Sequence, residues 1–110
     1  MREWAGDYLA VSSVVLFELW YGVENSGRVK ENTERLRVLL SGDLDLLDFD
    51  DEDAQTTGRV RAALEKTGTP IGAYDLLIAG QALRRGLTVV TANTSEFSRV
   101  TGLSWEDWTI

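Results

Sequence analysis

Carboxylate and amide side chains gather in the second half of this chain, where a helix begins and where a strand ends. Asp75 lies at the start of an apolar segment, 73–85, which Gly86 closes. A short β-branched segment, 88–91, comes next, and the polar run 93–96 (Asn-Thr-Ser-Glu) follows it directly. Mg²⁺ and Mn²⁺ prefer oxygen ligands of this kind, so the pattern indicates a site for a hard metal ion.

Glu18 is a further candidate ligand, because it is the only charged residue in the apolar segment 14–23. This segment predicts a helix that is apolar nearly all round, which is typical of a buried element. A buried carboxylate without a partner costs several kcal/mol, so Glu18 should have a specific role there. The alternative is a glutamate that reaches solvent or pairs with an arginine such as Arg28 or Arg99.

Each remaining candidate also has a purely structural explanation. The helix dipole alone favours Asp75 in a first helical turn by about 0.3–1 kcal/mol. Asn93 and Glu96 are ordinary turn residues when each is considered separately. The acidic run 43–53 lacks the spacing of a calcium loop, since its third ligand position falls on Leu47 and no glycine follows. The metal-site hypothesis therefore depends on the whole set of residues.

Composition removes several common kinds of catalytic site. The chain has 110 residues, no cysteine, no histidine and a net charge of −7. Serine–histidine and cysteine–histidine triads and thiolate zinc sites are therefore excluded.

No apolar run approaches the ~20 residues that span a bilayer, and the lack of cysteine fits a reducing cytoplasm. We expect a cytoplasmic protein without membrane contact. The negative charge counts against a simple nucleic-acid-binding module, but less against a nuclease whose acids bind metal ions.

Strand and helix patterns alternate along the chain and predict one α/β domain over residues 1–110. The expected strands are 8–11, 44–49, 87–91 and one in the tail, and the expected helices are 14–24, 28–40, 50–66 and 73–85. Such an order favours a parallel sheet covered by helices. In open sheets of this kind the active crevice lies beyond the carboxyl ends of the strands. Glu18, Asp75 and Asn93 are therefore expected near one edge.

In their order and spacing these residues resemble the PIN-domain endoribonucleases, and specifically the VapC-like toxins of toxin–antitoxin pairs. Three segments carry the resemblance: Ser12–Gly22, Thr69–Asp75, and Thr91–Phe97 with Arg99-Val100 following. Each motif alone is weak, but three in register across essentially the whole chain are specific. The resemblance implies a three-layer α/β/α fold with a mostly parallel central sheet, and metal-dependent hydrolysis of RNA.

The resemblance also implies roles for single residues. Glu18 and Asp75 match two metal-binding acidic residues of the family. Asn93 matches the fourth position, which is often aspartate, and Glu96 is a nearby supporting carboxylate at the metal. Thr91 matches a hydroxyl residue near the scissile phosphate. The implied cofactor is Mg²⁺ or Mn²⁺, and the implied partners are an RNA substrate, a cognate antitoxin protein and a second copy of the toxin in a homodimer.

One part of the family pattern is absent from this sequence. The family opens with a strand that ends in a metal-binding aspartate and continues into a helix, about 20–25 residues in all. The nearest substitute, Asp7, matches no family motif. We therefore expect an N-terminally truncated member with weak or no activity. The alternative is a non-catalytic remnant that binds an antitoxin across the helix around 17–23, where the negative charge suits a basic partner.

Overall fold

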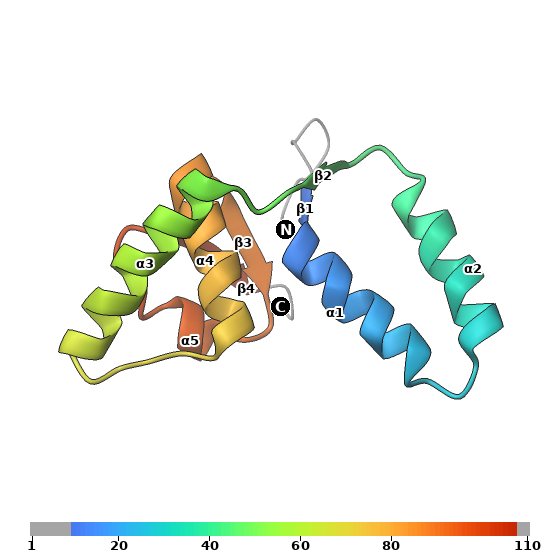
Figure 1. Cartoon of the computed structure of the whole chain (residues 1–110), viewed down its shortest axis with the longest axis horizontal. Helices are drawn as coiled ribbons and strands as arrows, with labels where there is room; N and C mark the ends of the chain where they lie inside the picture. Colours follow the sequence, from blue (N-terminus) through green and yellow to red (C-terminus); the bar gives the residue numbers. More distant parts are fainter. Residues whose placement is uncertain (1–9, 108–110) are drawn as a thin grey trace. The chain divides into compact units, whose positions relative to one another are not determined.

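The computed structural model describes residues 10–107, which fall into two compact units, one within residues 1–48 and one within 49–110 (Figure 1). The first unit contains β1 (Ala10–Ser12), α1 (Ser13–Glu24), α2 (Val29–Leu40) and β2 (Asp45–Leu47). The second contains α3 (Asp51–Lys66), α4 (Ala73–Arg85), β3 (Thr88–Thr91), α5 (Thr94–Phe97) and β4 (Ser104–Asp107). No helix among residues 10–107 is long and apolar enough to cross a membrane.

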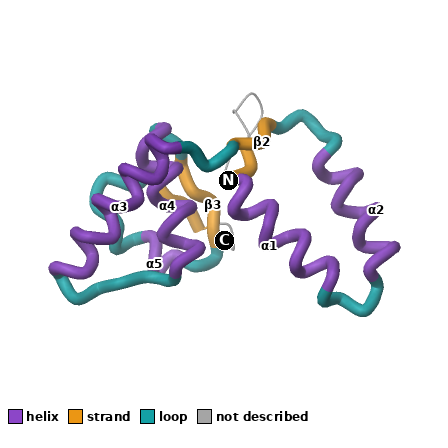
Figure 2. Tube along the Cα trace, in the orientation of Figure 1, coloured by secondary structure: helices purple, strands orange, loops and turns teal. Residues whose placement is uncertain are grey.

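Both units contain a parallel pair of strands, which confirms the predicted α/β class. In the first unit β1 pairs with β2, from Ala10↔Asp45 to Ser12↔Leu47. In the second unit β3 pairs with β4 over the whole length of both strands. Within the described residues these are two separate two-stranded sheets, whose strands are orange in Figure 2. The prediction of a single domain stays a prediction.

The helix boundaries agree closely with the sequence pattern because local signals set them. Ser12 caps α1, and its hydroxyl oxygen accepts a hydrogen bond from the Val14 N–H at 3.1 Å. Helix α4 spans the predicted 73–85 and ends at Gly86, whose φ of 67° is left-handed. The short helix α5 was not predicted, because its four polar and aromatic residues form no periodic pattern.

The burial predicted for the first unit was wrong. In α1 only Val23 is buried, while Phe17 is 53% exposed and Glu18 is exposed as well. On α2 Leu36 is buried, whereas Leu39 is 62% exposed. The physical reason is size, because two helices and two short strands bury only a small fraction of their surface.

The second unit has the larger hydrophobic core. Helix α4 packs against both α3 and β3 (Figure 1), and apolar side chains from α3, α4 and the segment after β3 fill the space between them. Its buried members are Val60, Leu64, Ala79, Ala82, Phe97, Val100 and Leu103. This core holds α4, whose first turn carries Asp75.

A buried ionic cluster joins α3 to α4 at Asp53, the last residue of the acidic run 43–53. Asp53 is 0% exposed, and it exchanges hydrogen bonds with Asp50 in a capping box, at 2.9 and 3.0 Å. From α4, Arg85 donates to its carboxylate at 2.9 and 3.2 Å and Gln81 at 3.1 Å. Burial alone would raise the pKa of Asp53, but these hydrogen bonds outweigh burial and lower the pKa to about 2.

Replacing Asp53 by asparagine should destabilise the protein in a pH-dependent way. The lowering of the Asp53 pKa from 3.8 to about 2 corresponds to about 2 kcal/mol of unfolding free energy. A lowered pKa stabilises the fold above pH 4 or so, and this contribution disappears as the pH falls towards about 2. Urea unfolding of wild type and Asp53→Asn should differ by about 2 kcal/mol near pH 7 and converge at low pH. Asp51→Asn, which changes an exposed acid of the same turn, is the control. A difference that stays constant with pH would contradict the explanation.

Gly80 allows α4 to approach α3 closely. A Cβ on Gly80 would overlap Thr57 Oγ1 and lie 2.7 Å from Thr57 Cα. Thr57 is buried, and its hydroxyl donates to the Asp53 carbonyl oxygen at 2.7 Å, so it has no room to move. Gly80→Ala should therefore lower the unfolding free energy by about 1–3 kcal/mol in urea titrations. Gly58→Ala on α3, where nothing lies within 4 Å, should instead be stabilising by up to about 1 kcal/mol. Equal effects of the two substitutions would contradict close packing at Gly80.

Candidate metal centre

Asp75, Asn93 and Glu96 lie together in the second unit, where α4 begins and β3 ends. Asp75 is in the first turn of α4, Asn93 precedes α5, and Glu96 is within α5. The Asn93 Nδ2 group donates to Asp75 Oδ2 at 2.7 Å and to Glu96 Oε2 at 2.6 Å. A single amide group thus bridges two carboxylates that are 21 positions apart in the sequence.

The second carboxylate oxygen of Glu96 holds the beginning of α4. It accepts a hydrogen bond from the Gly72 N–H at 2.6 Å, and Gly72 is a helix cap without a side chain of its own. Arg99 Nη1 donates to the Pro70 carbonyl oxygen at 2.9 Å. The turn after β3 is therefore tied twice to the loop before α4. The negative charge is also favourable at a helix N-terminus.

These contacts favour the ionised form of Glu96. The hydrogen bond with the Asp75 side chain contributes most to lowering the pKa of Glu96, followed by those from the Gly72 N–H and the Asn93 amide. Thr91 also positions Asn93, because its Oγ1 accepts a hydrogen bond from the Asn93 N–H at 2.9 Å. The site therefore combines an ionised carboxylate, a second carboxyl group and an oriented amide.

The donors of this cluster fit a hard divalent cation. Mg²⁺ commonly binds one or two protein carboxylates and keeps several water ligands. No group of three or more acidic, histidine or cysteine residues among those described is placed to hold a metal, so the local set is two carboxylates and an amide. The amide oxygen Oδ1 of Asn93 lies 3.4 Å from Ser95 Oγ. A half-turn of the amide would be needed to present this oxygen beside the carboxylates.

The remaining candidates, Glu18 and Asp7, belong to the first half of the chain. Glu18 lies on α1 in the first unit, and its meeting with Asp75 stays a prediction. Asp7 lies outside the described residues. Sequence reasoning missed Gly72 and Arg99. The available signal was that α4 begins without a Ser, Thr, Asp or Asn cap, so its free N–H groups need an acceptor from elsewhere.

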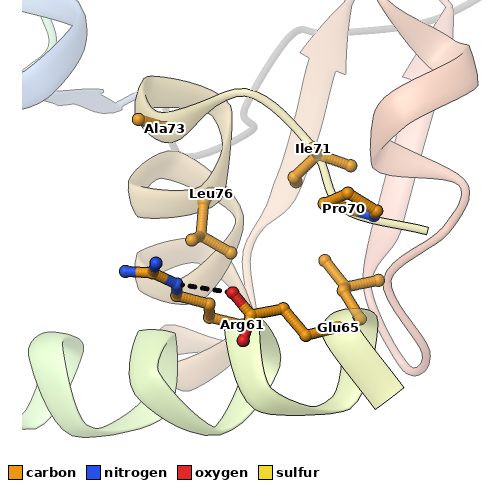
Figure 3. A pocket seen from close by; sticks show the side chains of 7 residues that line it. Arg61, Glu65, Pro70, Ile71, Ala73 and Leu76 are labelled. Atoms are coloured by element: carbon orange, nitrogen blue, oxygen red, sulfur yellow. Dashed lines mark hydrogen bonds and ion pairs between the residues drawn. The ribbon is translucent and has the colours of Figure 1, made fainter. Parts of the chain in front are cut away.

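A cavity of about 240 Å³ lies beside the beginning of α4, between α3 and the loop that leads into α4 (Figure 3). Its apolar lining comes from Leu64, Pro70, Ile71, Ala73 and Leu76. The charged residues in its wall neutralise each other, since Arg61 Nε lies 3.0 Å from Glu65 Oε2 (dashed in Figure 3). This cavity therefore presents no unpaired charge to a ligand.

Comparison with known proteins assigns the chain to a family. Residues 1–103 match the PIN domain model. The tRNA(fMet)-specific endonuclease VapC of Shigella flexneri is 46% identical over 100 residues, which cover 91% of this chain and 75% of that protein. Ribonuclease VapC2 of Rickettsia felis is 41% identical over 100 residues, which cover 91% of this chain and 74% of that protein.

Solved structures agree with this assignment. A chain in the crystal structure of VapBC2 from Rickettsia felis, bound to a DNA fragment from its promoter, superimposes with a TM-score of 0.89 at 39% identity. That match covers 94% of this chain and 77% of the other. A chain of DNA-bound VapBC from Salmonella typhimurium superimposes with a TM-score of 0.85 at 45% identity, and the match covers 90% of this chain and 74% of the other. The chain belongs to the PIN-domain family, and its relatives are VapC ribonucleases, a class that is generally metal-dependent.

The contact between Glu96 and Gly72 can be tested by amide hydrogen exchange. Glu96→Ala removes the acceptor of the Gly72 N–H, so exchange of that amide should accelerate by about tenfold, as expected for a charge-assisted hydrogen bond. Glu96→Gln keeps an oxygen acceptor and should accelerate exchange of the Gly72 amide less. Glu65→Ala, which removes an exposed glutamate of α3, should leave the amide unchanged. Wild-type exchange at Gly72 in Glu96→Ala would show that the contact does not hold the helix start.

Proposed function

We propose that this protein is a metal-dependent endoribonuclease toxin of a toxin–antitoxin system, with its catalytic centre at the beginning of α4. The main support is the meeting of Asp75, Asn93 and Glu96 in a chain that is 46% identical to a VapC endonuclease. The cysteine-free and histidine-free composition supports the same chemistry, because oxygen ligands remain the strong metal ligands available. A cytoplasmic location fits this function and stays a prediction.

In this proposal Glu18, Asp75 and Asn93 bind the metal, which is Mg²⁺ or Mn²⁺, and Glu96 supports them. The bound ion would supply a water of lowered pKa and neutralise charge at the scissile phosphate. Before an ion binds, the Asn93 amide nitrogen holds Asp75 at 2.7 Å, and the half-turn of that amide would exchange this contact for an oxygen ligand. Asn93 is neutral, so the centre carries less negative charge than one with aspartate in that place.

The protein's own groups also orient and accept protons at this centre. Thr91 holds the Asn93 backbone through its hydroxyl oxygen, and its hydroxyl hydrogen is available to donate towards a phosphate oxygen. Because the chain has no histidine or cysteine, a carboxylate would accept the proton of an attacking water. Glu96 keeps the helix start, and so the Asp75 carboxylate, in a constant place through Gly72.

A second, compatible function is binding to a cognate antitoxin. The support is the apolar surface of α1, where Phe17, Leu19 and Tyr21 are 53%, 39% and 63% exposed. Several of the similar solved structures are VapBC assemblies. An apolar helix of a basic antitoxin would cover this surface and complement the net charge of −7. The expected toxin homodimer stays a prediction.

Replacing Asp75 by alanine should remove metal-dependent RNA cleavage and weaken Mn²⁺ binding by about tenfold or more. Glu18→Ala should have the same effects. The measurements are cleavage of an unstructured RNA in gel assays and Mn²⁺ titration calorimetry. Asp51→Ala is a matched control, because it also removes an acidic residue from the first turn of a helix, and it should leave both readouts unchanged.

Unchanged cleavage in Asp75→Ala and Glu18→Ala would contradict the assignment of the centre. If the wild-type chain binds a purified antitoxin but cleaves no RNA with either metal, the protein is a non-catalytic antitoxin-binding remnant of such a toxin.

A further inference from the structure

A second cavity in the second unit has a different charge from the first. Its volume is about 310 Å³, and it lies between α3 and the turn after α5. Two arginines, Arg59 and Arg99, and two threonines, Thr67 and Thr101, line it together with apolar side chains. No carboxylate is among its lining residues, although the chain carries a net charge of −7. It therefore differs from the first cavity, whose arginine, Arg61, is paired with a carboxylate.

The two arginines of the cavity also differ from the others in their partners. Within the described residues, five arginines pair with carboxylates, namely Arg28, Arg35, Arg61, Arg84 and Arg85. Arg37 lies over the Trp20 ring. Arg59 forms no ion pair or hydrogen bond within residues 10–107, and Arg99 donates to a neutral carbonyl oxygen. Arg59 therefore keeps its donors and charge for an anionic ligand. Arg99 keeps further N–H donors, although its charge also acts on Glu96, and planar guanidinium groups suit phosphate.

The wall of the cavity behind these cations is apolar. Val60, Leu64 and Val100 are all buried and belong to the hydrophobic core of the unit. An apolar surface beside guanidinium groups suits an unpaired nucleotide, whose base packs on apolar or planar side chains while its phosphate meets the cations. A volume of about 310 Å³ is at the lower limit of ordinary ligand pockets, which suits one nucleotide.

Arg99 connects this cavity to the candidate metal centre. Its Nη1 group holds the Pro70 carbonyl oxygen, two residues before Gly72, whose N–H binds Glu96. The same short turn, 96–99, therefore contributes one residue to the metal centre and one to the cavity.

We propose that the cavity lined by Arg59 and Arg99 binds one unpaired nucleotide of the RNA substrate, with its phosphate on the two guanidinium groups. The proposal rests on the nuclease function proposed above and names residues that bind its substrate. It predicts a phosphate contact that contributes to affinity and follows the salt dependence of phosphate binding.

The test compares Arg59→Ala with Arg61→Ala. Both substitutions remove one arginine from α3, but Arg61 lines the other cavity and is neutralised by Glu65. The readout is fluorescence-anisotropy binding of an unpaired RNA oligonucleotide in EDTA, which prevents cleavage, over a range of salt concentrations. Arg59→Ala should weaken binding about threefold to tenfold and reduce the slope of log K against log salt by about 0.7, the value for one phosphate of a single strand. Arg61→Ala should change affinity by less than about twofold.

Equal binding by the two variants, or no RNA binding by the wild type, would overturn the proposal. Competition by free 5′-AMP as strong as competition by the oligonucleotide would assign the cavity to a mononucleotide and also overturn it. Cleavage assays on the same proteins separate this inference from the nuclease function. Intact cleavage without an Arg59 effect rejects only the cavity, whereas an Arg59 effect on binding without any cleavage rejects only the nuclease.

Discussion

Helix α4 lies where it does because Asp53, buried on α3, holds the residues at its C-terminal end. A fully buried carboxylate is unfavourable unless it is paired and hydrogen-bonded, and here Arg85 and Gln81 supply both. The absence of a side chain at Gly80 brings the two helices close enough for these bonds to form. The apolar core of Val60, Leu64, Ala79 and Ala82 is the larger part of the interface, but the ionic cluster determines its register.

The opposite end of α4 is held by a different interaction with the same consequence. Glu96 accepts the free N–H of Gly72, and the Asn93 amide joins Glu96 to Asp75. Because the helix is fixed at both ends, the Asp75 carboxylate has little freedom to move. A metal centre needs such constraint, since ligands that are already placed lose less entropy on binding. The polar residues of the candidate centre thus contribute to the structure as well as to the proposed chemistry.

The distribution of charge separates three regions of this acidic chain. Carboxylates dominate the candidate centre at α4, and paired charges cancel beside the cavity of Arg61. The cavity of Arg59 is lined by two arginines that form no salt bridge within residues 10–107. The first unit adds exposed apolar surface on α1. Such surface is typical of sites that bind another protein. Metal, RNA phosphate and protein partner would then each meet a part of the chain with the matching chemistry.

Much of this arrangement follows from the sequence alone, because its causes are local. The cap at Ser12, the stop at Gly86 and the apolar period of 73–85 define helices within a few residues of themselves. The order of motifs also brought Asp75, Asn93 and Glu96 into one predicted site. Burial and pairing depend instead on which distant segments meet. Only the tertiary structure shows that Asp53 is enclosed, that Glu18 is exposed and that Arg59 has no carboxylate partner in the described residues. The sequence determines which side chains can be charged, but the free energy of each charged group depends on the neighbours that the fold brings to it.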